Sequence, residues 1–250
     1  MIKITRTSKP VQLTKALQES LTEEFKKTGK NVWNIPFLKD ALLAMSGNKC
    51  CYCEADISEE SKYLEVEHFH NKDKYQNEVL EWDNLLPSCK RCNGTKSSHD
   101  TIIEPIINPC NINPKDHLLF WNYRIKAVDS LGRMTISVLN LNDQDRLVTK
   151  RFEIGNAIHD RLEHLNDLMD DYISGIQSNT LRRNRIVSGL KKLLKEGLPN
   201  VIYAATSSTI IINDIEYSNL KRKLNDSGLW DSELSEIENK LSTVSLNLAK

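Results

Sequence analysis

The sequence predicts an α+β fold, in which a small cysteine-rich module interrupts a mostly helical chain. Apolar residues recur at helical spacing near both ends of the chain, whereas short alternating and β-branched runs occupy its middle. We therefore expect a helical segment at 1–45, a compact module at 46–100, and a region at 101–250 that is mixed at first and then mainly helical.

Two helices are expected before the module. The first runs from about Pro10 to Lys27, because apolar residues recur every four positions, proline suits a first turn and Gly29 suits the exit. The second should begin near Pro36 and stop at Gly47. Inside the module, residues 63–67 alternate as a strand does, and residues 82–86 are expected to form a loop.

The region after the module begins with a proline-punctuated stretch at 104–114, which we expect to be an ordered linker. Residues 118–125 and 134–139 are rich in β-forming residues and predict strands, with Gly132 available for a turn between them. Residues 201–212 are rich in β-branched residues, and their pattern fits either a strand or a buried helix.

Three helices are expected further along the chain. Asn142 or Asp143 could cap a long helix, a basic amphipathic helix is expected at 180–196, and a terminal helix at about 231–247. The apolar positions of the terminal helix are Leu234, Ile237, Leu241, Val244 and Leu248. This narrow apolar stripe could pack on the chain's own helical half or dock a partner.

The composition describes a globular protein. The 250 residues are 39% hydrophobic and 27% charged, and no apolar run approaches the roughly 18 residues that a membrane-spanning helix needs. The N-terminus lacks the apolar core of a signal peptide, and six cysteines, four of them in metal-binding spacing, fit a reducing compartment. We therefore expect a cytoplasmic protein without membrane contact.

The charge is zero overall but unevenly distributed, which argues against binding of nucleic acid over the whole surface. Residues 46–100 carry seven basic against eleven acidic side chains, whereas residues 177–197 carry six basic against one acidic. An acidic module needs help to hold a polyanion. We expect Arg182, Arg183 and Arg185 to contact nucleic acid or a partner, although such a helix face is often only solvated.

Two Cys-x-x-Cys pairs predict a structural zinc site, because each pair can bend around a metal ion in one turn. The expected ligands are Cys50, Cys53, Cys89 and Cys92. Cys51 competes with Cys50, but only Cys50 has the correct spacing. We expect Cys51 and Cys110 to be ordinary reduced thiols.

The interval between the pairs and its edge contain residues that suit metal-assisted hydrolysis of a phosphodiester. His68 is a potential general base, Glu67 beside it is a hard acidic ligand, and Asn84 and Asn93 add two carboxamides. His68 alone would be weak evidence, because most histidines are not catalytic. In this setting it predicts a hydrolytic nuclease.

The order Cys-x-x-Cys, Glu-His, Asn, Cys-x-x-Cys-Asn-x-x-Lys resembles the zinc-bound branch of the HNH endonucleases over about Lys49 to Lys96. The resemblance implies a ββα-metal (HNH) module, a β-hairpin followed by a helix. The whole layout also resembles the PtuB family, the HNH nuclease subunits of Septu anti-phage systems, some of which are associated with retrons. The shared features are a basic N-terminal helix, the nuclease module, an Ile-Ile-Glu-Pro stretch and a helical C-terminal half.

The HNH resemblance implies a role for each site residue. His68 would deprotonate the attacking water, and Asn84 would orient its imidazole. Glu67 and Asn93 would hold one catalytic magnesium ion, and Lys96 would contact phosphate. Cleavage would leave 5′-phosphate and 3′-hydroxyl ends.

Two of these assignments have alternatives. Asn93 could instead cap the helix that follows the second cysteine pair. His70 could be a second cation ligand or the base itself, because two residues along a strand it would share the face of His68. The family usually has Pro-Lys where this chain has Asn71-Lys72.

The Septu resemblance implies a partner, a larger ATPase of the ABC/SMC-like type (PtuA-like), with DNA as the expected substrate and phage defence as the role. This chain has no nucleotide-binding loop pattern of its own. Two other functions fit the motifs. One is a stand-alone restriction-type HNH nuclease, and the other is a non-catalytic zinc-knuckle adaptor that binds nucleic acid or protein.

Overall fold

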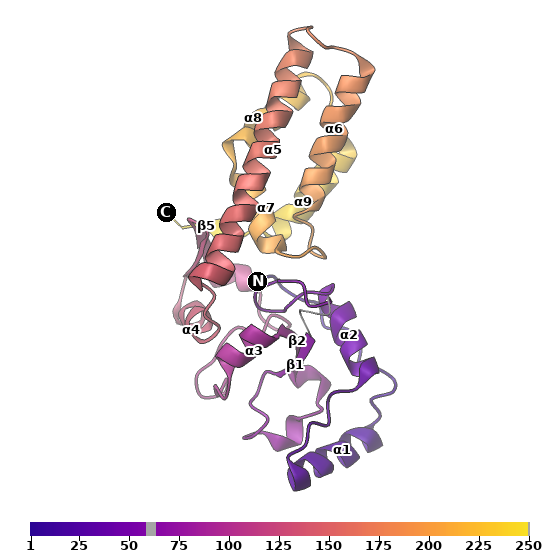
Figure 1. Ribbon diagram of the computed structural model, residues 1–250, viewed down its shortest axis with the longest axis vertical. Coiled ribbons are helices and arrows are strands. Elements are labelled where there is room, and N and C mark those ends of the chain that lie inside the picture. Colours follow the sequence, from indigo (N-terminus) through magenta and orange to yellow (C-terminus); the bar gives the residue numbers. More distant parts are fainter. Residues whose placement is uncertain (59–63, 250) are drawn as a thin grey trace. The chain divides into compact units, whose positions relative to one another are not determined.

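A computed structural model describes residues 1–58 and 64–249 of the chain (Figure 1). The fold is α+β, as the sequence predicts, because helices dominate and the described strands form two small sheets. Among these described residues, no helix combines the length and the apolar character that crossing a membrane requires.

The chain forms two compact units. The first unit comprises Met1–Leu118 and Ile125–Asn142, and the second comprises Leu119–Arg124 and Asp143–Lys250. The N-terminal helical segment and the cysteine-rich module therefore belong to one unit.

Helices α1 (Lys15–Thr28) and α2 (Pro36–Ser46) precede the module. α1 begins later than expected, because Thr14 is its N-cap and accepts a backbone N–H of the first turn through its hydroxyl. Both ends are as predicted. Gly29 follows α1 with φ 68° and Gly47 follows α2 with φ 65°, a left-handed conformation that glycine adopts at low cost.

A β-hairpin and a short helix form the centre of the first unit. Strand β1 (Leu64–His68) pairs antiparallel with β2 (Leu85–Cys89), and α3 (Lys90–Lys96) follows directly. The expected strand is confirmed from residue 64 onward, and Tyr63 lies outside the described residues. His68 stands at the end of β1, opposite Leu85.

The loop expected at 82–86 is wrong for residues 85–86, which belong to a strand, whereas residues 82–84 form a short turn. Two 3-10 turns, η1 (Gln76–Glu78) and η2 (Trp82–Asn84), precede β2, which includes Pro87. Proline and asparagine in this stretch favour a loop locally. Pairing with β1 overrides that preference, since strand formation depends on tertiary context.

The strand expected at 134–139 is also wrong, because these residues lie in or directly after helix α4 (Ser130–Val138). A 3-10 turn, η3 (Pro114–Asp116), lies earlier in the chain. Asp129 caps the helix by accepting the N–H of Gly132 at 2.9 Å. Gly132 does not make a turn. A Cβ atom there would lie 2.2 Å from the backbone oxygen of His117. Glycine therefore allows the helix backbone to lie close to the backbone of His117.

The run expected as one strand at 118–125 is divided by a turn. Strands β3 (Leu118–Trp121) and β4 (Arg124–Ala127) flank Asn122 and Tyr123, which have positive φ angles of 45° and 62°. A short strand near the C-terminus, β5 (Asn247–Leu248), pairs parallel with β3.

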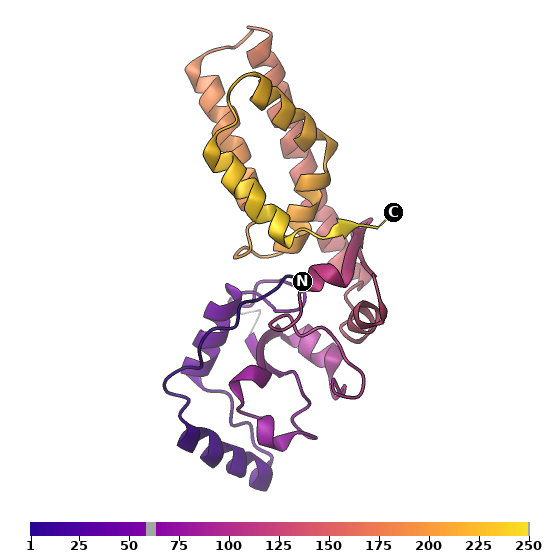
Figure 2. The same cartoon turned by 180° about the vertical axis from the view of Figure 1, so that it is seen from behind.

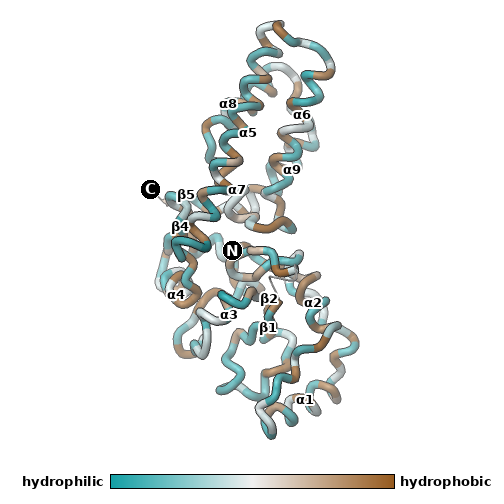
Figure 3. Tube along the Cα trace, viewed as in Figure 1, coloured by the Kyte–Doolittle hydropathy of each residue, from teal (hydrophilic) through white to brown (hydrophobic). Residues whose placement is uncertain are grey.

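The second unit is mainly helical. Its elements are η4 (Gln144–Val148, a π-helical turn), α5 (Thr149–Ile173), α6 (Thr180–Lys195), α7 (Ala204–Asn213), α8 (Ile215–Asp226) and α9 (Ser232–Val244). Hydrophobic and hydrophilic residues alternate along α5 and α6, as in amphipathic helices (Figure 3). From behind, α8 and α9 lie over α5 and α6 (Figure 2). The basic helix at 180–196 is confirmed, and 201–212 lies mostly in the helix α7.

Asp143 caps the long helical run and accepts the N–H of Arg146 at 2.9 Å. Asn142 has a different role. Its Oδ1 accepts a hydrogen bond from the backbone N–H of Ile125, and its Nδ2 donates one to the carbonyl oxygen of the same residue. The expected terminal helix is confirmed as α9. Its apolar positions Leu234, Ile237, Leu241 and Val244 are buried, and the first three belong to the apolar core of the second unit. Leu248 does not belong to the helix, because it lies in β5 and is 49% exposed. The stripe therefore packs on the chain's own helical half, which was one of its two predicted roles, and its four buried positions are not exposed to a partner.

Candidate active site

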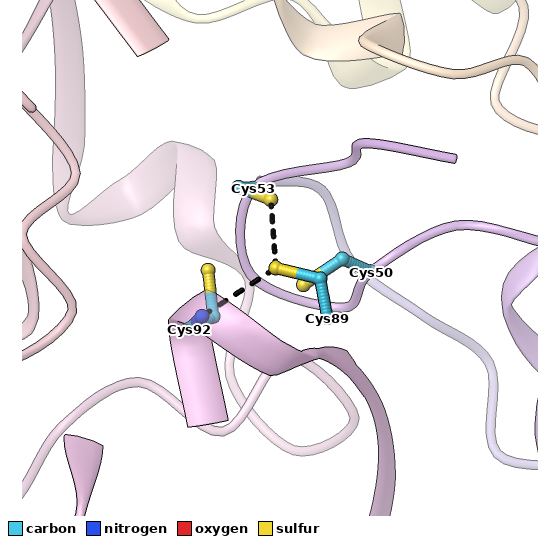
Figure 4. Close-up of side chains that lie close together, drawn as sticks. All are labelled: Cys50, Cys53, Cys89 and Cys92. Carbon is cyan, nitrogen blue, oxygen red and sulfur yellow. Dashed lines mark hydrogen bonds between the residues drawn. The ribbon is translucent and has the colours of Figure 1, made fainter. Parts of the chain in front are cut away.

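The four predicted cysteines form one cluster (Figure 4). All four Sγ atoms lie within 4.8 Å of one another, and Cys53 and Cys89 are 3.7 Å apart. The edge of a tetrahedron with zinc–sulfur bonds of about 2.3 Å is about 3.8 Å. The backbone N–H of Cys92 also donates to the Sγ of Cys89. The cluster therefore fits a structural zinc ion.

Local structure explains why these cysteines meet. Cys50 and Cys53 lie in a turn after α2, where the backbone N–H of Cys50 donates to Ala55 at 2.8 Å. Cys89 ends β2 and caps α3, and Cys92 lies in its first turn. Cys51 is buried beside Cys50 but is not one of the four clustered cysteines, and burial raises the pKa of its thiol well above the usual value. It is not a ligand.

A cavity of about 400 Å³ lies next to the hairpin. Its lining includes Trp33, Glu65, Glu67, His68, Asn93 and Lys96. Three of the four residues expected to be catalytic therefore meet at one cavity. The fourth, Asn84, is buried elsewhere.

The imidazole of His68 is held on two sides. Its Nε2 lies 2.9 Å from the carbonyl oxygen of Val79, and the ring of Trp33 packs against it edge to face at 4.5 Å between centroids. A carbonyl oxygen only accepts hydrogen bonds, so Nε2 carries the proton and Nδ1 keeps a lone pair. Burial lowers the pKa of His68 to about 4, which leaves the ring neutral at pH 7.

Asn84 does not contact the imidazole, as the resemblance implied it would. Its Oδ1 accepts the N–H of His70 at 2.6 Å, and its Nδ2 donates to the carbonyl oxygen of Glu78 at 3.1 Å. Glu78 immediately precedes Val79. Asn84 therefore shapes the loop whose carbonyl holds His68, and a backbone acceptor of this kind leaves no signal in the sequence.

Glu67 is almost fully buried and pairs with Lys96. Their side chains are each 2% exposed, and Nζ lies 2.7 Å from Oε1. Burial raises the pKa of Glu67 to about 7, and Lys96 offsets this only in part. Lys96 also donates to the carbonyl oxygen of His68 at 2.8 Å. The structure thus places Lys96 against the carboxylate, in the lining of the cavity.

Asn93 lies inside α3 and does not cap it, because Cys89 occupies the N-cap position. Its Nδ2 donates to Oε2 of Glu65 at 2.6 Å. Glu65 was not foreseen as a site residue. Its signal is in the sequence, since residues two apart on β1 face the same side and Glu65 precedes Glu67 by two.

His70 points to a different partner. β1 ends at His68, so the alternation of the strand does not extend to His70. Its Nδ1 lies 2.6 Å from Oε2 of Glu78, and His70 is not among the residues that line the cavity. This geometry favours His68 over His70 as the base.

The basic helix α6 is partly neutralised. Arg182 lies 3.6 Å from Asp171, whereas Arg183 and Arg185 have no carboxylate partner in the part of the chain that the structure describes. Leu181 is 79% exposed, so it does not belong to the buried apolar face of α6. That face consists of Ile186, Leu190, Leu193 and Leu194.

Comparisons with known proteins identify the family. The family model described as HNH endonuclease matches residues 50–99. The chain is 42% identical over 233 residues to "Septu protein PtuB" of Bacillus thuringiensis, covering 93% of this chain and 90% of that protein. It is 27% identical over 292 residues to "Septu protein PtuB" of Bacillus mycoides (strain KBAB4), covering 98% and 96%. The chain therefore belongs to the PtuB family of Septu proteins and is a nuclease whose HNH endonuclease domain spans residues 50–99.

Proposed function

We propose that this nuclease hydrolyses phosphodiester bonds of DNA with one magnesium ion, and that it acts with a PtuA-like ATPase in anti-phage defence. The observation that carries the proposal is the convergence of His68, Glu67 and Asn93 on one cavity. His68 offers an unprotonated Nδ1 there, while Glu67 and Asn93 offer oxygen atoms.

Glu67 and Asn93 would hold the cation. Both supply oxygen ligands, and magnesium takes few protein oxygens and keeps several waters. When bound, the ion would stabilise negative charge on the phosphate and on the departing 3′ oxygen. The Asn93 amide nitrogen is turned toward Glu65, so its oxygen stays available.

His68 would act as the general base. Its Nδ1 accepts a proton from the attacking water, while the Val79 carbonyl holds the ring through Nε2. Without substrate, burial gives His68 a pKa of about 4, which is low for a general base. A bound phosphate brings negative charge near the imidazole, which favours the protonated ring, whereas the positive charge of the bound cation opposes it. The pKa in the complex reflects both charges. The products would carry 5′-phosphate and 3′-hydroxyl ends.

Lys72 and Lys90 are better candidates for phosphate contacts than Lys96. Both line the cavity, and the structure describes no carboxylate within ion-pair distance of either one. Lys72 lies over the ring of Trp33 at 5.9 Å, with its charge near His68. In the second unit, Arg183 and Arg185 could bind the polyanion or the partner.

A cleavage assay tests the proposal. The purified chain, with and without the ATPase, is incubated with duplex DNA, single-stranded DNA and tRNA in magnesium or in a chelator. We expect cleavage of DNA that requires magnesium and His68. Preferred cleavage of tRNA would overturn the DNA assignment. Full specific activity without the ATPase would favour a stand-alone restriction-type nuclease, and binding without cleavage would favour the adaptor.

A further inference from the structure

Glu67 has two oxygen atoms in different surroundings. Oε1 accepts from Nζ of Lys96 at 2.7 Å and from the hydroxyl of Tyr52 at 3.3 Å. Among the residues that the structure describes, no hydrogen-bond donor contacts Oε2. A carboxylate held through one oxygen has a fixed orientation and presents the other oxygen to the cavity that it lines.

Both donors are themselves fixed by burial. Tyr52 is 0% exposed and Lys96 is 3% exposed, so neither side chain has alternative partners in solvent. A buried hydroxyl or ammonium that loses its acceptor pays the full cost of desolvation. These contacts are therefore expected to persist when the rest of the site moves.

The two donors come from different parts of the zinc module. Tyr52 lies between Cys50 and Cys53 in the first cysteine pair, and Lys96 is the last residue of α3, which begins after the second pair. Lys96 also bonds the carbonyl oxygen of His68. It therefore ties α3, which carries Asn93, to the strand that carries the other two site residues.

We propose that Tyr52 and Lys96 are positioning residues that anchor Oε1 of Glu67, leave Oε2 for the catalytic cation, and thereby couple the cysteine cluster to the cation site. This inference rests on the proposed function. It assigns to Lys96 a role toward the carboxylate in place of a phosphate contact. Partners of metal-binding side chains that lie outside the metal shell commonly change metal affinity by about 10- to 100-fold.

The test measures binding of Mn²⁺ alone to the zinc-loaded full chain, by calorimetry or by electron paramagnetic resonance. Tyr52→Phe removes only the hydroxyl, and we expect about tenfold weaker Mn²⁺ binding with zinc content unchanged. Tyr217→Phe is the matched control. Tyr217 is a buried tyrosine that donates to Glu238 at 2.7 Å in the second unit, far in sequence from the cavity residues, so Mn²⁺ affinity should not change.

A second variant separates anchoring from competition. Lys96→Met should also weaken Mn²⁺ binding, because Glu67 loses its anchor and α3 loses its attachment to β1. Tighter binding by Lys96→Met would show that the lysine competes with the cation, and unchanged affinity in Tyr52→Phe would show a purely structural hydroxyl. Either result overturns the inference while wild-type cleavage stands. If the wild type neither binds Mn²⁺ nor cleaves nucleic acid, the proposed function fails and the inference falls with it.

Discussion

The two units bury different kinds of side chain. In the first unit Lys49, Glu54, Glu67 and Lys96 are each at most 3% exposed, whereas in the described part of the second unit the buried charged residue is Arg151. Leucine and isoleucine from α5 to α9 fill the core of the second unit. Buried charges cost free energy unless they are paired, so the first unit depends on specific contacts and on its cysteine cluster. The second unit is stabilised by apolar packing.

The largest expected effect is loss of the cysteine cluster. Cys89→Ser should abolish zinc binding and unfold the first unit, because structural zinc contributes about 10–16 kcal/mol in small zinc domains. Helicity from the second unit should remain. Zinc content and hydrogen exchange of each unit are the measurements, and Cys110→Ser, a buried thiol outside the cluster, is the control. A zinc-free variant with a protected first unit would show that this unit needs no metal.

The next effect is on catalysis. His68→Ala should lower the rate of cleavage by about 10²- to 10⁴-fold, as expected for loss of a general base, with zinc content unchanged. His70→Ala should retain most of the activity, because His70 bonds Glu78 and does not line the cavity. The assignment of the base is reversed if the two variants show the opposite pattern.

A smaller effect is expected in the apolar core of the second unit. Leu241 is fully buried, and Leu241→Ala should destabilise this unit by about 2–5 kcal/mol while the zinc content stays the same. Leu181→Ala is the control, since Leu181 is exposed and its loss should cost little. Urea unfolding followed by circular dichroism measures the difference. An equal free energy of unfolding for both variants would contradict the assignment of α9 to the core.

The smallest effect is a pH dependence in the second unit. Nδ1 of His159 lies 2.9 Å from Oδ2 of Asp214, and this hydrogen bond raises the pKa of His159. The folded state then binds the proton more tightly, so the pair stabilises fully below the unfolded pKa of about 6.5. The contribution is lost as the pH rises through the higher folded pKa. Because His159 is 44% exposed, we expect about 0.5 kcal/mol or less.

Asp214→Asn tests this pair without removing a helix cap. Oδ1 of Asp214 accepts the N–H of Glu216 at 2.7 Å, and asparagine keeps this acceptor while losing the charge. The free energy of unfolding of the second unit should then depend less on pH around neutrality. An unchanged pH profile would assign the dependence to other groups.

Sequence patterns were most informative where local chemistry decides the structure. Gly29 and Gly47 ended their helices as predicted, and the spacing of the cysteine pairs predicted a cluster that the structure contains. Patterns failed where distant residues decide. Residues 85–89 form a strand because β1, which is far from them in the sequence, pairs with them. The strand predicted at 134–139 is wrong for a local reason, since Asp129 caps a helix there in spite of the β-forming composition.

The sequence by itself therefore determined the α+β class, the four clustered cysteines and the candidate pair Glu67 and His68, because these depend on periodicity and on short spacings. Only the tertiary structure decided which atoms face each other. It showed that Lys96 holds Glu67, that a backbone carbonyl holds His68, and that Trp33 from the N-terminal segment reaches the cavity. These contacts join residues distant in the chain, and no local preference encodes a distance between them.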